Sequence, residues 1–466
     1  MMGDPPRRVR RRSGSHARTL VLSAIVLGCG VLVLGLFTSE AAPVKGPSIP
    51  SAADLRAGSQ RPADPPLTKP AAPTVSSRAS HLAAERFDQA QQLLARQAAA
   101  VRDRDRDAYL ATIDPQEATF AKVAARTFDN LVRMGVTDYR FGSLVEDLGG
   151  LTPERREVLG PTAWVADVGV TFRLEGPDPE LWKTDLRTVF VERQGVTYLA
   201  ADGEGTDSGA ATPLWLSDTV GVVRSKHTMV IGAGPQSRLE RYARTAERSV
   251  SRVSRVWGDD WPEYVVVIVP ATQAQMERMV GVEPDSQNAV AAVTTSVGRV
   301  DPSKASHIVL NPEPFDKIGS LGRIVVLTHE TTHVAAHATV STMPVWLSEG
   351  FADYVGFHES GLSTAVIAQE FLAEVRRSGG PEELPGGPDF DPQAKALDQA
   401  YESAWSACKY IAYRWGTDTL VEFYRVMDGA KSEAEQDEAY ETVLNTTRED
   451  FVARWRRYVE VKSRGG

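Results

Sequence analysis

Cysteine is almost absent from this chain of 466 residues, which contains only Cys29 and Cys408. Cys29 lies in an apolar segment, and Cys408 lies far away in sequence within a stretch that predicts a helix. Two cysteines placed in this way cannot build a disulfide framework or a cysteine-based metal site. Their scarcity does not indicate the cytoplasm, because an exported chain can also lack disulfides.

The chain also has fewer basic residues than acidic residues. The chain has 52 Lys and Arg against 61 Asp and Glu, a formal net charge of −9. Its basic residues are not interleaved with aromatic residues, so the sequence argues against a nucleic-acid partner. The apolar and charged fractions are those of a globular protein, and the length predicts two or three domains with linkers.

The N-terminus combines a basic cluster with an apolar run. Residues 1–18 contain six arginines, and residues 19–38 include the uncharged stretch Leu20–Phe37, which is long enough to cross a bilayer as a helix. Basic residues stay on the cytoplasmic side of a membrane. We therefore predict a single-pass cell-membrane protein with a basic cytoplasmic tail, a transmembrane anchor and extracytoplasmic C-terminal domains.

Two other interpretations of the same segment stay open. Ser39-Glu40-Ala41 is an acceptable cleavage site, which would make the segment a secretory signal and the chain a secreted protein. Val26-Leu27-Gly28-Cys29 resembles a bacterial lipobox, although the residues after Cys29 remain apolar. Residues 39–80 are rich in Pro, Ala and Ser and predict an extended linker that does not fold by itself.

Residues 81–205 predict a small α+β domain. Apolar spacing indicates helices over His81–Arg106 and Glu117–Met134. Alternating stretches then predict four strands, at Asp138–Val145, Ala163–Leu174, Thr184–Arg193 and Val196–Asp202. Helices followed by a curled sheet, with the segment Asp103–Pro115 as an early helix and turn, resemble the nuclear-transport-factor-2-like (SnoaL-like) superfamily. This resemblance implies a binding or scaffolding domain rather than a catalytic one.

Residues 213–466 predict a second domain whose first half is β-rich and whose second half is helical. The predicted elements of the first half are a strand at Val220–Ile231, a helix at Ser237–Trp257, a strand at Tyr264–Val269, a short helix ending at Val280, and β-prone stretches at Ala289–Val300 and His307–Leu310. This order suits an enzyme whose site lies where the two halves meet.

An HExxH motif occupies residues 329–333. On a helix, His329 and His333 share one face and can reach one metal ion. Glu330 lies beside that face, where it can take a proton from a metal-bound water. Ser320 is a candidate N-cap for this helix, and Pro344 prevents its continuation.

A second segment, Pro344–Tyr354, supplies a third ligand candidate. Catalytic zinc commonly has three protein ligands and one open position. Glu349 is far enough from His333 for one helix to end and another, beginning near Pro344, to pack back on it. Asp353 is one turn beyond Glu349 and can accept the free N–H of a ligand histidine, which would fix the ring.

The segment Trp346-Leu347-Ser348-Glu349-Gly350-Phe351-Ala352, downstream of HExxH, resembles the gluzincin peptidases, the group of thermolysin and the zinc aminopeptidases. Their pattern is HExxH followed on a second helix by Glu, often within W-L-x-E-G-x-A, and thermolysin-like members carry an Asp where Asp353 stands. The resemblance implies a gluzincin-like fold and one Zn²⁺ ion held by His329, His333 and Glu349. His337 is too far along the helix from His329 to join them, and His358 has no motif support.

A tyrosine downstream is a candidate for stabilising the oxyanion. Tyr401-Glu402-Ser403-Ala404-Trp405 is similar to the Tyr-Glu-x-Gly-aromatic segment of zinc aminopeptidases, with Ala404 in place of glycine. The Gly-x-Met-Glu-Asn strand of those aminopeptidases is missing from residues 288–310. The resemblance therefore favours an endopeptidase, and the β-prone stretches there could pair with an extended peptide.

The sequence thus predicts a zinc metallopeptidase in which Glu330 is the general base and the substrate is a peptide or protein. Two alternatives stay open. One is a non-catalytic, membrane-tethered ligand-binding protein with a degenerate peptidase-like domain. The other is a zinc hydrolase that acts on a non-peptide amide or ester, because the motif defines water attack better than it defines the substrate.

Overall fold

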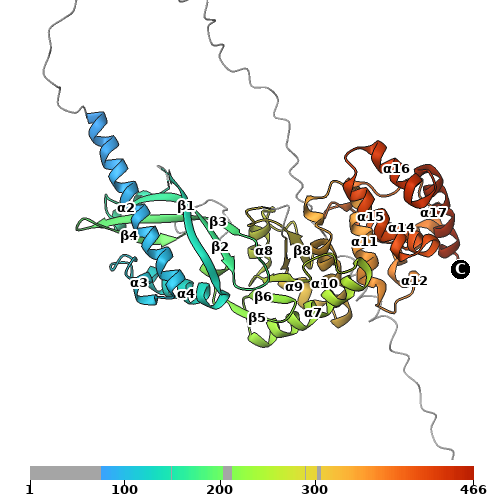
Figure 1. Cartoon of the computed structure of the whole chain (residues 1–466), viewed down its shortest axis with the longest axis horizontal. Coiled ribbons are helices and arrows are strands. Elements are labelled where there is room, and N and C mark those ends of the chain that lie inside the picture. Colours follow the sequence, from blue (N-terminus) through green and yellow to red (C-terminus); the bar gives the residue numbers. More distant parts are fainter. Residues whose placement is uncertain (1–74, 148–149, 203–212, 289, 302–305, 466) are drawn as a thin grey trace, which may run out of the picture.

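The first part of the described chain packs helices against an antiparallel sheet (Figure 1). The computed structural model describes residues 75–465 except 148–149, 203–212, 289 and 302–305. Its α+β character agrees with the sequence prediction. The elements of this first part are α2 (Val75–Asp103), α3 (Arg106–Leu110), α4 (Ala118–Met134), β1 (Val136–Asp147), α5 (Pro153–Leu159), β2 (Trp164–Leu174), β3 (Trp182–Arg193) and β4 (Val196–Asp202).

The four strands pair in chain order, β1-β2-β3-β4, all antiparallel. Helix α2 covers the sheet with a buried apolar face that includes Leu93 and Leu94 at 0% and 3% exposure. It begins six residues before the predicted start at His81. The limits of the predicted domains and the resemblance to nuclear-transport-factor-2-like proteins remain predictions.

The second part is built on a mixed sheet. Its elements are α6 (Leu214–Ser217), β5 (Gly221–Arg224), β6 (Thr228–Gly232), α7 (Gln236–Trp257), β7 (Val265–Val269), α8 (Gln273–Val280), β8 (Ala292–Thr295), β9 (His307–Leu310) and α9 (Pro312–Lys317). The strand order is β5-β6-β7-β9-β8, with β6, β7 and β9 parallel and the two edge strands antiparallel to their neighbours.

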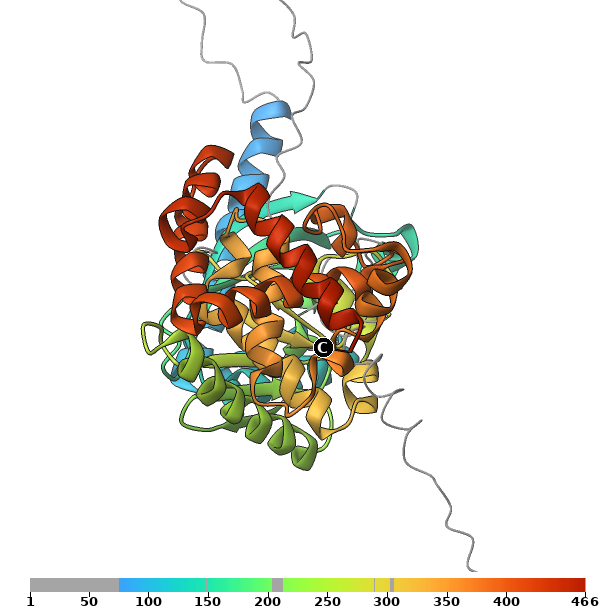
Figure 2. The same cartoon turned by 90° about the vertical axis from the view of Figure 1, so that its right-hand side faces the viewer.

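This second sheet is covered on both faces. Its strands are therefore nearly continuous runs of apolar residues. Val265, Val267 and Val269 point into one core with the helices that follow. The alternate residues Val266 and Ile268 point into another core, which is continuous with that of the first part. In both views α7 runs along the lower side of the molecule (Figure 1, Figure 2), so its outer face is available to solvent.

The sequence prediction of one long strand over Val220–Ile231 is wrong. A tight hairpin divides this stretch into β5 and β6, and the amide of Ser225 donates to the carbonyl of Thr228 at 2.9 Å. Polar residues from Arg224 to His227 stop the apolar run and form the turn.

The last part is helical, as predicted. It comprises α10 (Ser320–Ala335), η1 (Ala338–Val340), α11 (Val345–His358), α12 (Thr364–Ile367), α13 (Gln369–Ser378), η2 (Gly387–Phe390), α14 (Leu397–Trp415), α15 (Thr417–Gly429), α16 (Glu433–Leu444) and α17 (Arg448–Ser463). Gly319, in an extended conformation, is the N-cap of α10, so Ser320 is the first helical residue rather than the predicted cap.

Helices α10, α11 and α14 approach one another closely through glycine. A Cβ atom on Gly350 of α11 would lie 2.4 Å from the carbonyl oxygen of Ala404 on α14. A Cβ atom on Gly356 would lie 3.1 Å from the carbonyl oxygen of Val325 on α10. Both neighbours are backbone atoms, which cannot swing aside as a flexible side chain can.

The predicted single-pass membrane location is not upheld. Within the described residues, no helix is both long and apolar enough to cross a membrane. The two longest described helices, α2 and α7, carry charged residues along their length, and a spanning helix requires an almost uncharged run. The basic tail, the anchor and the lipobox or cleavage site all fall within residues 1–74, outside the described residues.

The close contact at Gly350 predicts a specific cost for adding one methyl group. Gly350→Ala should lower the free energy of unfolding by about 1–3 kcal/mol or more, because the new Cβ forces α11 and α14 apart. Urea unfolding followed by tryptophan fluorescence measures this change. Gly429→Ala is the matched control, since no heavy atom outside its own helix lies within 4 Å of its added Cβ. Equal stability of the two variants would show that the contact is not tight.

Candidate metal centre

Helix α10 carries the two histidines of the HExxH motif into the interior. The helix is enclosed by α7, α11, β8 and β9, and His329 and His333 are 0% and 1% exposed. Because they are one helical turn apart, their rings lie on the same face. The two Nε2 atoms are 3.0 Å apart, so both rings aim the same nitrogen at one point.

Helix α11 brings a carboxylate to that point. The Oε2 atom of Glu349 lies 3.4 Å from Nε2 of His329 and 3.7 Å from Nε2 of His333. Pro344 is the N-cap of α11, so the chain turns back at the predicted place. The fold therefore brings together the three residues that the sequence predicted as metal ligands, in a group that could bind a metal ion.

Asp353 fixes the orientation of one ring. Its Oδ1 atom lies 2.8 Å from Nδ1 of His329. Because a carboxylate accepts, Nδ1 carries the proton, and Nε2 is left with its lone pair facing His333 and Glu349. The predicted partner of a ligand histidine is thus in hydrogen-bonding contact with His329.

The donor set fits a zinc ion. Both carboxylate oxygens of Glu349 are buried and accept no hydrogen bond within the described residues. Buried, unsatisfied oxygens are costly unless a cation or donor compensates them. Zinc bonds of about 2.0–2.2 Å in a tetrahedron place neighbouring ligand atoms about 3.3–3.6 Å apart. The observed separations of 3.0, 3.4 and 3.7 Å bracket that value.

Thr294 of β8 forms hydrogen bonds with Glu330. Its hydroxyl lies 2.7 Å from Oε2 of Glu330 and 3.0 Å from the Glu330 carbonyl oxygen. The other carboxylate oxygen, Oε1, has no hydrogen-bond partner in the described part of the chain. Sequence analysis missed Thr294, because nothing in the β-prone stretch around it distinguishes one threonine from the next.

Burial and attraction to the two histidines shift the pKa values of the three buried carboxyl groups in different directions. Burial raises the pKa of Glu330 above its ordinary value, against the opposing effect of His329 and His333. Burial likewise raises the pKa of Asp353. For Glu349 burial acts in the same direction, but the two histidines outweigh it and lower the pKa of that carboxyl. Glu349 therefore suits an anionic ligand, and Glu330 suits a group that gains and loses a proton.

Tyr401 lies outside this group of donors, and so do His337 and His358, which sequence analysis excludes as ligands. Tyr401 is 1% exposed within α14, where its ring meets Phe390 edge-on with centroids 5.2 Å apart. His337 follows α10 with a left-handed φ of 51° and is exposed. His358 ends α11, its ring centroid 5.4 Å from that of Tyr354.

Comparisons with known proteins give a distant likeness. No protein family description matches the chain, and no curated protein matches it. Among solved structures, one similar chain is an M1 zinc metallopeptidase from Deinococcus radiodurans with a bound Tyr-Ser-Ala substrate. The two are 13% identical, with a TM-score of 0.31, over 63% of this chain and 61% of the other. The chemistry of the site is therefore argued from its own geometry.

The contact between Thr294 and Glu330 predicts a change in stability that needs no substrate to measure. Thr294→Val removes a buried donor from a buried carboxyl group while keeping the side-chain shape. We expect it to lower the free energy of unfolding of the metal-free chain by about 1–3 kcal/mol. Thr294→Ser keeps the hydroxyl and should recover most of the loss. If Val and Ser variants unfold at the same urea concentration, the hydrogen bond contributes nothing.

Proposed function

We propose that this protein is a zinc-dependent hydrolase that cleaves peptide bonds. The observation that carries the proposal is the convergence of His329, His333 and Glu349 on one buried point, with the two oxygens of Glu349 receiving no hydrogen bond from the described residues. Those three residues would hold one zinc ion. When bound, zinc supplies a Lewis acid that acidifies a water molecule and polarises a carbonyl group.

Glu330 is the general base in this proposal. It follows His329 directly, and Thr294 donates to its Oε2 atom, while Oε1 has no hydrogen-bond partner among the described residues and can take a proton. Its raised pKa favours transfer of that proton onward to the leaving amine. Asp353 keeps the ring of His329 in the tautomer whose Nε2 atom can act as a ligand.

Tyr401 is the proposed donor to the oxyanion. It lies on α14, which packs directly against α11 next to Glu349, at the contact between Gly350 and Ala404. Its burial against Phe390 means that its hydroxyl would act within a dry environment, where hydrogen bonds to a developing charge are strong.

A peptide is the proposed substrate because of the strand beside the site. Strand β8 is the last strand of its sheet, and Thr294 places it directly over Glu330. All four residues of β8 are buried here, so an extended peptide would pair with its edge through main-chain hydrogen bonds only after neighbouring residues move. This mode of binding does not require a free terminus, and it is consistent with an endopeptidase.

The metal group is closed to solvent in this conformation. His329, Glu330, His333 and Glu349 are each 0–1% exposed. A substrate can reach Glu330 only if neighbouring residues move, and enzymes that exclude water commonly open and close in this way. Turnover by this site therefore requires a second, open conformation.

Zinc content tests the proposed ligands. We expect about one zinc ion per purified chain by elemental analysis, and a large loss of zinc in His333→Ala and in Glu349→Ala. His337→Ala is the control, because that histidine is exposed and outside the group. A well-folded chain that takes up no zinc during reconstitution would contradict the proposal.

Glu330→Gln separates metal binding from catalysis. This variant should retain its zinc, since Glu330 is not one of the converging ligands, and should lose about 10²–10⁴-fold in kcat on a peptide library. Full activity in this variant would exclude Glu330 as the base. Zinc bound by the wild-type chain without any turnover would instead favour the non-catalytic binding protein, and turnover of esters alone would favour the non-peptide hydrolase.

A further inference from the structure

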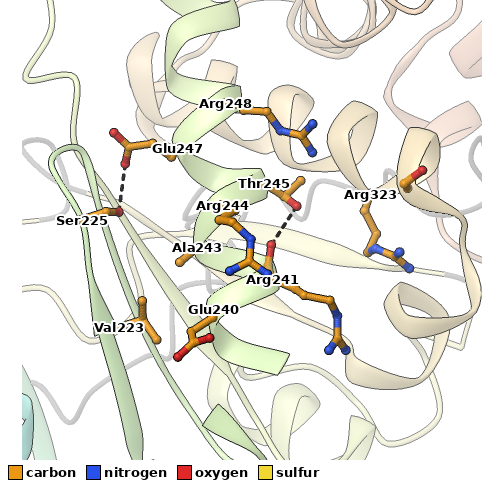
Figure 3. A pocket seen from close by; sticks show the side chains of 11 residues that line it. Val223, Ser225, Glu240, Arg241, Ala243, Arg244, Thr245, Glu247, Arg248 and Arg323 are labelled. Atoms are coloured by element: carbon orange, nitrogen blue, oxygen red, sulfur yellow. Dashed lines mark hydrogen bonds between the residues drawn. The ribbon is translucent and has the colours of Figure 1, made fainter. Parts of the chain in front are cut away.

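A second candidate site lies on the outer side of α7, away from the metal group. It is a cleft of about 640 Å³ between α7, strand β5 and the first turn of α10. Four arginines line it, Arg241, Arg244 and Arg248 from α7 and Arg323 from α10 (Figure 3). Arg241, Arg244 and Arg248 are exposed, and Arg323 is half-buried.

The arginines of α7 form a stripe along one side of the helix. The arginines at the two ends of the stripe form salt bridges, and those in its middle form none with the described residues. The members of the stripe are Arg238, Arg241, Arg244, Arg248, Arg252 and Arg255. At one end Arg238 pairs with Asp316, and at the other both Arg252 and Arg255 pair with Glu359. Within the described residues, the middle three arginines form no salt bridge.

Arg323 adds a cation from a second helix. It donates to the backbone carbonyl of Ile318 and, in the described part of the chain, forms no salt bridge. The chain as a whole has a net charge of −9. A cleft lined by four arginines that form no salt bridge with the described residues is therefore unlike the rest of the chain in its charge. Like charges held together without a counter-charge repel, and a bound anion would relieve that cost.

Two acidic residues, Glu240 and Glu247, offset only part of the positive charge of the four arginines. Glu247 lines the β5 side, where its carboxylate accepts a hydrogen bond from the Ser225 hydroxyl at 2.9 Å and lies 2.7 Å from the His227 ring nitrogen, away from α10. Glu240 also faces that side. The opposite side, with Arg241, Arg248 and Arg323, therefore carries most of the positive charge.

The spacing of these arginines defines the size of the anion. Arg241 and Arg248 are two turns apart, about 10 Å along the helix axis, with Thr245 buried between them. In Figure 3 the Arg241 and Arg248 guanidinium groups point to opposite ends of the cleft, an arrangement that suits a chain of phosphates better than a single phosphate. Guanidinium groups bind phosphate through paired N–H donors. The lining contains no aromatic residue on which a nucleotide base could stack.

We propose that this cleft binds a soluble ligand carrying two or more phosphate groups and no aromatic base. Arg241, Arg248 and Arg323 bind its phosphates on the α10 side, and Arg244 closes the β5 side. The cleft is separate from the metal group: Ser249, on the inner side of α7, binds Thr331 of the HExxH helix at 2.8 Å. The proposal is independent of whether the metal site catalyses.

Isothermal titration calorimetry of the full chain tests the proposal. Tripolyphosphate is expected to bind with one site per chain, more tightly than orthophosphate and more tightly than a tetraglutamate peptide. The double variant Arg241→Gln and Arg248→Gln should bind tripolyphosphate at least tenfold more weakly, and so should Arg323→Gln. Binding should also weaken as the salt concentration rises, because the contacts are ionic.

Arg255→Gln is the matched control. It removes the same charge from the same helix, but Arg255 pairs with Glu359 and does not line the cleft. Its affinity for tripolyphosphate should equal that of the wild-type chain. Any one of three results would overturn the proposal: no binding of millimolar tripolyphosphate, equal losses in Arg255→Gln and the cleft variants, or tighter binding of tetraglutamate. Circular dichroism of each variant confirms that it is folded.

Discussion

Charge buried without water is the constraint on which the centre of this protein depends. Glu330, Glu349, Asp353 and two histidines lie together at 0–5% exposure. Burying ionised groups costs several kcal/mol each unless opposite charge and hydrogen bonds compensate. Asp353 and Thr294 supply some compensation, but the oxygens of Glu349 receive no hydrogen bond from the described residues. A divalent cation would satisfy what the side chains leave unpaired.

Glycine makes this crowded centre geometrically feasible. Glu349 can reach the two histidines only if α11 packs tightly between α10 and α14. Gly350 and Gly356 permit that packing, each on a different side of the helix. The glycines that follow Glu349 on α11 are therefore required by helix packing, and Glu349 itself is the residue that would hold a metal ion. The segment containing Glu349 and Gly350 thus combines a carboxylate that faces the histidines with a glycine that allows close helix packing.

Local patterns predicted much of this arrangement. The HExxH spacing and the return helix after Pro344 were readable because they depend on periodicity within one element. Thr294 and Arg323 could not be read in the same way, since each acquires its role from an element distant in sequence. The hairpin at Ser225 was missed because apolar residues on both sides of the turn resemble one strand. The role of Tyr401 remains a prediction, and its burial shows only that α14 packs it inward.

A buried contact joins the two sheets beside β8. Arg299, after β8, forms a 2.7 Å salt bridge with Asp178 of the first part, and its guanidinium carbon lies 3.6 Å above the ring of Trp182. Backbone hydrogen bonds join Lys183 to Gly298 and Val300 to Leu181 on either side. The loop that follows the strand over Glu330 is therefore held by the N-terminal sheet. A shortened chain beginning after residue 213 would keep His329, His333 and Glu349 and the pairing of β8 with β9, but its loop after β8 would lose these contacts.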